Sequence, residues 1–126
     1  MITVQDIMST TVFRVDGSTS IREAARLMAD KSMGSLLVTQ EHKITGIVTE
    51  ADMVKRVLAY DLNPDTHSVE EIMSSPLVSV PCDTGLTEAR DMMDKEDIRH
   101  LLVTVSDDIS GIVSVRDIIR DPRQGN

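Results

Sequence analysis

Near the start of the chain, the spacing of apolar residues changes from a strand pattern to a helix pattern. Thr11–Val15 alternates weakly and is β-branched, which predicts a short strand. Ser20 followed by Glu23 forms a capping-box motif, and apolar residues then recur at helical spacing. These signals predict a helix that begins after Ser20 and ends near Lys31.

Two further apolar runs lie close together. Ser35–Gln40 and Lys43–Thr49 are rich in Val, Ile, Leu and Thr, and only the polar pair Glu41-His42 separates them. Two such runs joined by a polar dipeptide predict a β-hairpin. Ala51–Tyr60 predicts a second helix, so the predicted order is strand, helix, hairpin and helix.

The second half of the chain shows the same order of patterns. Gly85 stands where Ser20 stood, so the cap of the longer helix is there a glycine. The predicted strand, helix, hairpin and helix are Leu77–Val80, Leu86–Glu96, His100–Val105 with Ile109–Ser114, and Val115–Arg120. Between the halves, 61–68 contains Asn63-Pro64-Asp65 and no periodicity, which is typical of a linker.

The chain is an internal repeat with an offset of 65 residues and no gap. The offset aligns Ile7–Ser9 with Ile72–Ser74 and Asp52 with Asp117, and it aligns the hairpins throughout. One offset that holds along a whole unit indicates two copies of one supersecondary structure. We therefore expect repeat 1 at 1–60, a linker at 61–68, repeat 2 at 69–121 and a flexible tail at 122–126.

Each copy predicts a β-α-β-β-α unit in which two helices cover a three-stranded sheet. The fold class expected is therefore α+β (α/β). Each sheet keeps one apolar face, so we expect the copies to pack face to face about a pseudo-two-fold axis, with clefts between them.

Composition restricts the possible functions. The net charge of −8 argues against DNA or RNA as a partner, and Phe13 and Tyr60 are the only Phe, Tyr or Trp residues, so no platform of stacked aromatic side chains is available. No apolar stretch is long enough for a membrane span, and no secretory signal is visible, so we expect a cytoplasmic protein. Cys82 is the only cysteine, and the three histidines share no metal-ligand spacing. Without a nucleophile elbow or a glycine-rich phosphate loop, we expect neither an enzyme nor a metal site.

Several motifs together resemble a tandem pair of CBS domains (cystathionine β-synthase domains, a Bateman module). They are the Asp6–Met8 and Glu71–Met73 openings, the Ile98–Val103 strand entry and the two Gly-Ile-Val-(Thr/Ser)-x-x-Asp turns. The resemblance covers the chain from about Ile2 to Asp121. It implies a stand-alone regulatory module without a required cofactor. Such a module binds AMP, ADP, ATP or S-adenosylmethionine in the clefts between the repeats and signals ligand state to an unknown effector protein.

The resemblance places the ribose-contacting acid at Asp52 in the first copy and at Asp117 in the second. An ionised carboxylate can accept from both hydroxyls of a ribose, and the hydroxyls of Thr49 and Ser114, three residues earlier, can donate to the ligand. The same spacing fits a helix-capping box, so each acid can also serve its own helix. The sequence leaves both roles open.

Positive residues that could contact phosphate gather in the second copy. Arg99-His100 aligns with Gly34-Ser35, and Arg116 aligns with Ala51, so we expect unequal clefts in which these cations bind phosphate. Lys31 is a weaker candidate in the first copy. The alternative is that the arginines are solvated surface charges and that His100 is a structural strand residue.

In the resembling family, the first strand of each repeat contacts the base edge through its backbone. The corresponding residues here are Thr11, Val12, Phe13, Pro76, Leu77 and Val78, with Ile47, Ile112 and Met8 or Met73 as apolar walls. Members of that family usually dimerise through their helices, which points to a homodimer face at Leu27, Val54, Met92 and Ile119, although the same positions could instead belong to the core of the chain. The alternative function is a ligand-free module for dimerisation or protein interaction.

Overall fold

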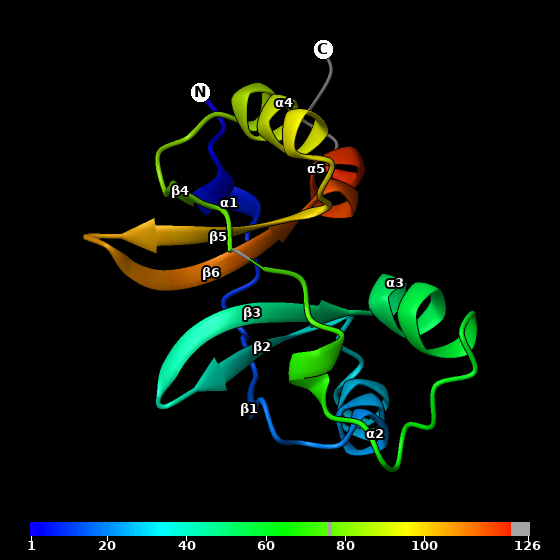
Figure 1. Ribbon diagram of the computed structural model, residues 1–126. Helices are drawn as coiled ribbons and strands as arrows, with labels where there is room; N and C mark the ends of the chain where they lie inside the picture. Colours follow the sequence, from blue (N-terminus) through cyan, green and yellow to red (C-terminus); the bar gives the residue numbers. More distant parts are fainter. Residues whose placement is uncertain (76, 122–126) are drawn as a thin grey trace. The chain divides into compact units, whose positions relative to one another are not determined.

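The computed structural model describes residues 1–75 and 77–121, so the expected tail at 122–126 lies outside the described residues. The chain forms two compact units (Figure 1). Unit 1 contains Met1–Val12 and Val78–Asn126, and unit 2 contains Phe13–Leu77. Each unit has one three-stranded sheet covered by helices, which confirms the α+β fold with two repeated units.

Unit 2 has the strand order β1-β2-β3, in which β1 pairs parallel to β2 and β2 pairs antiparallel to β3. The short helix α3 continues into a π-helical segment, η1, in which the Ala59 N–H donates to the Val54 carbonyl at 3.0 Å. The elements are β1 (Arg14–Asp16), α2 (Ile21–Lys31), β2 (Ser35–Gln40), β3 (Lys43–Thr49), α3 (Glu50–Asp52), η1 (Met53–Leu58) and the 3₁₀-helix η2 (Val69–Glu71).

Unit 1 repeats this topology with the strand order β4-β5-β6. Its β4 pairs parallel to β5, and β5 pairs antiparallel to β6 in the same register as the first hairpin. The elements are α1 (Val4–Ile7), β4 (Ser79–Pro81), α4 (Leu86–Glu96), β5 (His100–Val105), β6 (Asp108–Ser114) and α5 (Val115–Arg120).

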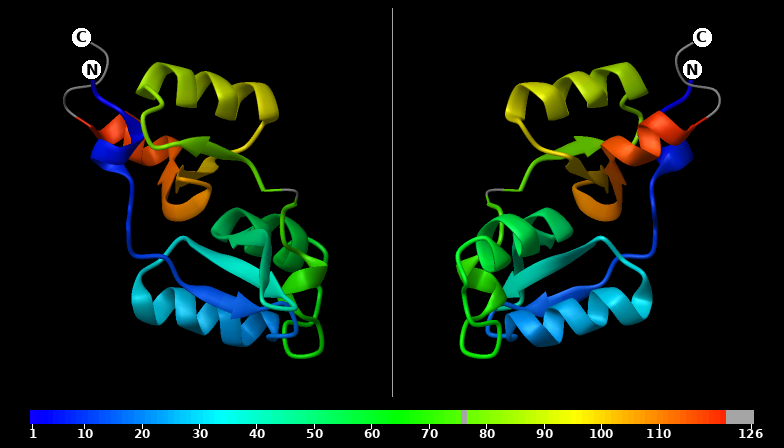
Figure 2. Two further views of the ribbon diagram at one scale, coloured as in Figure 1. Left: turned by 90° about the vertical axis from the view of Figure 1, so that its left-hand side faces the viewer. Right: turned by 90° about the vertical axis from the view of Figure 1, so that its right-hand side faces the viewer.

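The predicted helical stripes form the core of each unit. In unit 2, α2 lies along one face of the sheet and buries Ile21, Ala24 and Met28 against strand residues such as Leu36 and Val48 (Figure 2). In unit 1, α4 buries Ala89 and Met93, while Ile118 of α5 joins the same cluster. The buried positions of both cores contain only aliphatic, Ala and Met side chains. Neither core therefore needs an aromatic residue at a buried position.

The predicted boundaries of the long helices and the first hairpin are confirmed. The first strand begins three residues later than predicted in the first copy and two residues later in the second, and the predicted helix 51–60 is split into α3 and η1. The sequence analysis missed α1 and η2, which are three or four residues long. A capping box nevertheless marks each of them, formed by Thr3 with Asp6 and by Ser68 with Glu71.

The structural units differ from the repeats expected at 1–60 and 69–121. Residues 1–12 belong to the unit that contains the second sheet, where Val4 is fully buried. Ser9 exchanges two backbone hydrogen bonds of 2.9 and 3.0 Å with Ile112 of β6. In unit 2, Ser74 pairs with Ile47 of β3 in the same way, at 2.8 and 3.1 Å. The opening segments of the two sequence copies contain Ser9 and Ser74. Each of them therefore pairs with the last strand of the hairpin in the other copy.

The expected linker, 61–68, contains no helix or strand, but its backbone carbonyls accept hydrogen bonds from the first residues of α2. The carbonyls of Pro64 and His67 accept from the N–H groups of Arg22 and Ile21 at 3.1 and 3.0 Å. Ser20 Oγ accepts from the next N–H of the helix at 3.1 Å, so three orphan donors of the first turn are satisfied. A hydrogen bond from the Arg22 guanidinium also lowers the pKa of Asp65 below its ordinary value.

Glycine is required at the two bridges between the opening segments and the sheets. A Cβ on Gly111 would lie 2.7 Å from the Ser9 carbonyl oxygen, and a Cβ on Gly46 would lie 3.0 Å from that of Ser74. A methyl group at Gly111 must therefore push the Ser9 backbone away from β6.

We predict that Gly111→Ala destabilises the protein by roughly 1–3 kcal/mol, because overpacking next to a backbone carbonyl is relieved only by moving the chain. Gly85→Ser is the matched control. The only neighbours of its added Cβ are Met1 side-chain atoms, the nearest at 3.4 Å, and a serine N-cap adds a few tenths of a kcal/mol in the favourable direction. Urea unfolding followed by circular dichroism measures both changes. Equal effects of the two substitutions would contradict this account of the bridge.

Candidate functional site

Asp52 of unit 2 is a capping residue for its own helix. Its Oδ2 accepts from the Thr49 N–H at 2.9 Å and from Thr49 Oγ1 at 3.1 Å. In return, Thr49 Oγ1 accepts from the Asp52 N–H at 3.3 Å. The capping role that the sequence allowed for these two residues is therefore realised in the structure.

The second oxygen of Asp52 is also occupied. Oδ1 accepts a hydrogen bond from Ser74 Oγ at 3.2 Å and lies 3.5 Å from Nε of Arg56. Asp52 is only 6% exposed, so few water molecules can reach the carboxylate. Both of its oxygens are thus committed to groups of unit 2.

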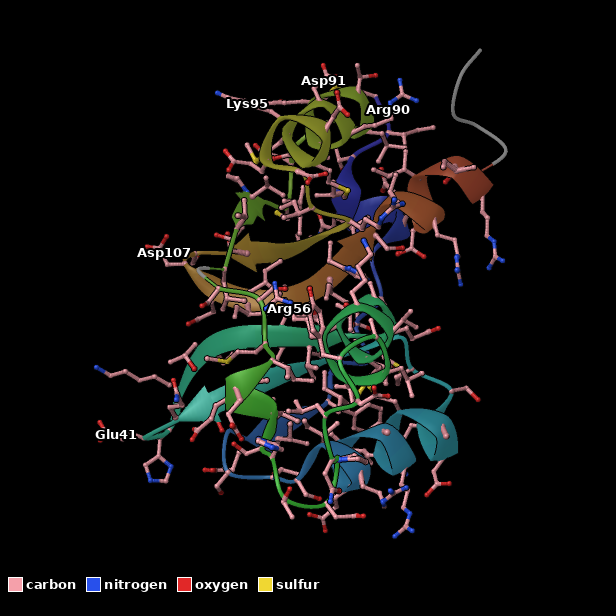
Figure 3. All side chains as sticks on the ribbon, turned by 45° about the vertical axis from the view of Figure 1, so that its right-hand side comes forward. Glu41, Arg56, Arg90, Asp91, Lys95 and Asp107 are labelled. Carbon is pink, nitrogen blue, oxygen red and sulfur yellow. The ribbon has the colours of Figure 1, made fainter. Side chains whose placement is uncertain are left out.

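Arg56, which is labelled in Figure 3 and was not among the predicted site residues, contacts both the acid and the segment of Ser74. Its Nη1 lies 3.2 Å from the carbonyl oxygens of Ile72 and Met73, to both of which it donates. The spacing of four residues between Asp52 and Arg56 was visible in the sequence as a helical ion pair. The contribution of Ser74 was not, because it depends on the pairing of its segment with β3.

Asp117 of unit 1 makes a simpler set of contacts. Its Oδ2 accepts from the Ser114 N–H at 2.9 Å, and Ser114 Oγ accepts from the Asp117 N–H at 3.1 Å. Within the part of the chain that the structure describes, no further hydrogen bond reaches this carboxylate, because Ser9, the equivalent of Ser74, donates to the Thr11 carbonyl at 3.4 Å. Asp117 is half-buried and keeps acceptor capacity for a ligand.

Three of the predicted phosphate contacts lie around Asp117. Arg116 precedes it on α5 and is exposed, and the Arg99 carbonyl accepts from the Val115 N–H at 2.9 Å, which fixes the Arg99 backbone at the start of the helix. His100 lies opposite Ser114 in the β5–β6 register and is half-buried. Unit 1 therefore brings together Arg99, His100, Ser114, Arg116 and Asp117.

A small cleft of about 160 Å³ lies beside this group. It is formed by the end of α4, the turn that leads into β5 and the start of α5, and it is lined by Arg90, Met93, Asp94, Asp97, Ile98, Arg99 and Val115. The cleft is smaller than a typical pocket for a drug-sized ligand. Its lining combines two arginines, Arg90 and Arg99, with two aspartates, Asp94 and Asp97.

The residues predicted to contact a base lie where the chain passes between units. Thr11 and Val12 end the first segment of unit 1, and Leu77 ends unit 2, while Pro76 lies outside the described residues. The carbonyls of Phe13 and Val78 already accept ladder hydrogen bonds from Leu37 and Leu102, at 2.9 and 3.0 Å. These two carbonyls therefore belong to the sheets.

The remaining candidates occupy equivalent places in the two units. Ile47 and Ile112 each pair with the opening segment, through Ser74 and Ser9 respectively. Lys31, the weaker phosphate candidate, has its Nζ 5.7 Å from the centroid of the Phe13 ring, in a cation–π contact. Among residues 1–75 and 77–121, no group of three or more His, Cys, Asp or Glu side chains could hold a metal ion, and no helix is long and apolar enough to cross a membrane.

Comparison with protein families decides the classification. The sequence model of the CBS domain matches residues 4–59 and again residues 69–123. The chain belongs to the CBS domain family. Both repeats found in the sequence are thus CBS domains, and their fold is that of a CBS pair.

Relatives with CBS domains match nearly the whole chain. The CBS domain-containing protein YhcV of Bacillus subtilis is 32% identical over 118 residues, which cover 94% of this chain and 84% of YhcV. A protein with CBS domains from Burkholderia ambifaria has a solved structure that matches with a TM-score of 0.86 and 30% identity, over 94% of this chain and 92% of that chain. The hexameric CBS-CP12 protein of bloom-forming cyanobacteria matches with a TM-score of 0.88 and 33% identity, over 96% of this chain and 71% of that chain.

Asp52 and Asp117 should differ in how much they stabilise the folded protein. We predict that Asp117→Ala costs about 1 kcal/mol, the usual effect of losing a cap, because Asp117 serves only its capping box. Asp52→Ala should cost roughly 2–3 kcal/mol, because it also leaves Ser74 and Arg56 without their shared acceptor. Denaturant unfolding of both variants measures the difference, and equal losses would contradict the extra contacts of Asp52.

Proposed function

We propose that this CBS pair is a regulatory module that binds an adenosine-containing ligand, namely AMP, ADP, ATP or S-adenosylmethionine, and signals ligand state to an effector protein. The observation that carries the proposal is the group at the start of α5. There, a carboxylate with remaining acceptor capacity, Asp117, adjoins a hydroxyl and two exposed arginines, Arg99 and Arg116.

Each part of this group suits one part of a nucleotide. Asp117 can accept from both hydroxyls of a ribose in charge-assisted hydrogen bonds, which favours ribose over deoxyribose. Arg99 and Arg116 present planar guanidinium groups that suit phosphate oxygens. Unit 1 contains no Phe, Tyr or Trp, so the base would lie against aliphatic side chains.

The module acts by binding, without a catalytic step of its own. A ligand changes the state of such a protein only if it binds two conformations with different affinity. The effector must therefore contact a surface that differs between these conformations.

A second function, a module for dimerisation, is favoured by a separate observation. Val54 and Ile119 occupy equivalent positions in the two repeats and are 57% and 68% exposed, although both are large aliphatic residues. Exposed apolar residues at repeated positions suit a contact with a second copy. A homodimer is compatible with ligand binding, and it becomes the whole function if the chain binds no nucleotide.

A thermal-shift panel of AMP, ADP, ATP, S-adenosylmethionine and NAD distinguishes the two functions. At a hundredfold excess over the dissociation constant, a true ligand stabilises the protein by about 2.7 kcal/mol and raises its melting temperature. We expect a rise with at least one adenosine ligand. No rise with any of the five would overturn the proposal and favour the dimerisation module.

The phosphate assignment is tested by Arg99→Ala. We expect affinity for ADP to fall about tenfold or more, because a charge-assisted hydrogen bond is lost. Lys95→Ala, which removes an exposed cation from α4 of the same unit, should leave the affinity unchanged (Figure 3). Isothermal titration measures both, and an unchanged affinity in Arg99→Ala would remove Arg99 from the site.

A further inference from the structure

We propose that Arg56 keeps the acid of unit 2 occupied, so that only Asp117, of the two equivalent acids, accepts a ribose. This inference rests on the proposed function and concerns which repeat binds the ligand. Arg56 is thus a positioning residue, because it acts through Asp52 and Ser74.

The carboxylate of Asp52 has a limited number of acceptor positions. An ionised carboxylate offers about four acceptor positions. Four donor groups surround the carboxylate of Asp52: the Thr49 N–H and Oγ1 at 2.9 and 3.1 Å from Oδ2, and Ser74 Oγ and Arg56 Nε at 3.2 and 3.5 Å from Oδ1. A ribose diol would have to displace two of these donors from an acid that is 6% exposed.

Arg56 also contacts the segment that carries Ser74. The Ser74 backbone pairs with Ile47 on β3, and the two carbonyls that precede it, of Ile72 and Met73, accept from Nη1 of Arg56 at 3.2 Å. Arg56 therefore fixes the backbone of Ile72 and Met73 in the position that brings Ser74 Oγ to Asp52. Through one guanidinium, it contacts the acid directly and positions the other donor.

Unit 1 has no arginine at the position equivalent to Arg56. Ser9 and Asp117 repeat Ser74 and Asp52, but the residue equivalent to Arg56 is Asp121. A carboxylate has no proton to donate at neutral pH, so it cannot hold the carbonyls that precede Ser9. Consistent with this, Ser9 Oγ donates to the Thr11 carbonyl instead of to Asp117. One change, from arginine to aspartate, thus accompanies the difference between the two acids.

The direct test is to count the adenosine molecules that the full chain binds. Adenosine is the appropriate probe, because unit 2 has Gly34 and Ala51 where unit 1 has phosphate-contacting cations, whereas a nucleoside depends on the ribose acceptor. In equilibrium dialysis with labelled adenosine, Arg56→Ala should bind one equivalent more than the wild type. Arg22→Ala, which removes another arginine of unit 2 from its carboxylate partner, should bind the same number as the wild type.

Two results would overturn the inference: no additional equivalent in Arg56→Ala, or two equivalents already bound by the wild type. The second result would leave the proposed function intact. If neither protein binds adenosine and the wild type also binds no ADP, the proposed function fails, and this inference fails with it.

A second pair of variants tests the inference even if Arg56→Ala does not fold. Asp117→Asn should weaken ADP binding at least tenfold, whereas Asp52→Asn should keep the wild-type affinity within about twofold. Loss of binding in Asp52→Asn would contradict the inference. If the two acids had only a structural role, the two substitutions would change the melting temperature of the protein and leave its affinity for ADP unchanged.

Discussion

The number of hydrogen bonds that one carboxylate can accept limits the contacts that the acid of each repeat can make. Both repeats begin the helix after their hairpin with a hydroxyl residue and an acid, and both acids use one oxygen to cap that helix. The remaining oxygen then decides the chemistry. In unit 2 it accepts from Ser74 and faces Arg56, whereas that of Asp117 has no further hydrogen bond within the described residues. Two repeats with the same motif thus present different surfaces to a ligand.

This difference depends on the exchange of opening segments between the sequence copies. Ser74 reaches Asp52 only because its segment pairs with β3, and the space for that pairing depends on Gly46. The same pairing in unit 1 brings Ser9 to Ile112 beside Gly111. Each unit is therefore built from both copies, and in unit 2 the opening segment supplies a hydrogen-bond donor to the acid of the other copy.

Much of the fold could be predicted because its signals are local. The α2 and α4 helices have clear apolar periodicity, and the β2–β3 hairpin has two strands separated by two polar residues. The exchange of opening segments could not be predicted from the repeat, since the offset of 65 residues is the same whichever sheet a segment joins. The short helices α1 and η2 lack periodicity, and their capping boxes were the only available signal.

The candidate site was predictable to the extent that it depends on neighbouring residues. Ser114 with Asp117 follows from a spacing of three, and the excess of cations in the second copy follows from alignment of the repeats. The occupied state of Asp52 required the structure, because Ser74 lies 22 residues away in the chain.

The central claim is that the two acids differ in their availability to a ligand, and carbon-detected NMR of the side-chain carboxyl groups tests it most directly. During a titration with ADP, the carboxyl resonance of Asp117 should shift along a saturable curve while that of Asp52 stays in place. A shift of Asp52 along the same curve as Asp117, or of Asp52 alone, would contradict the account.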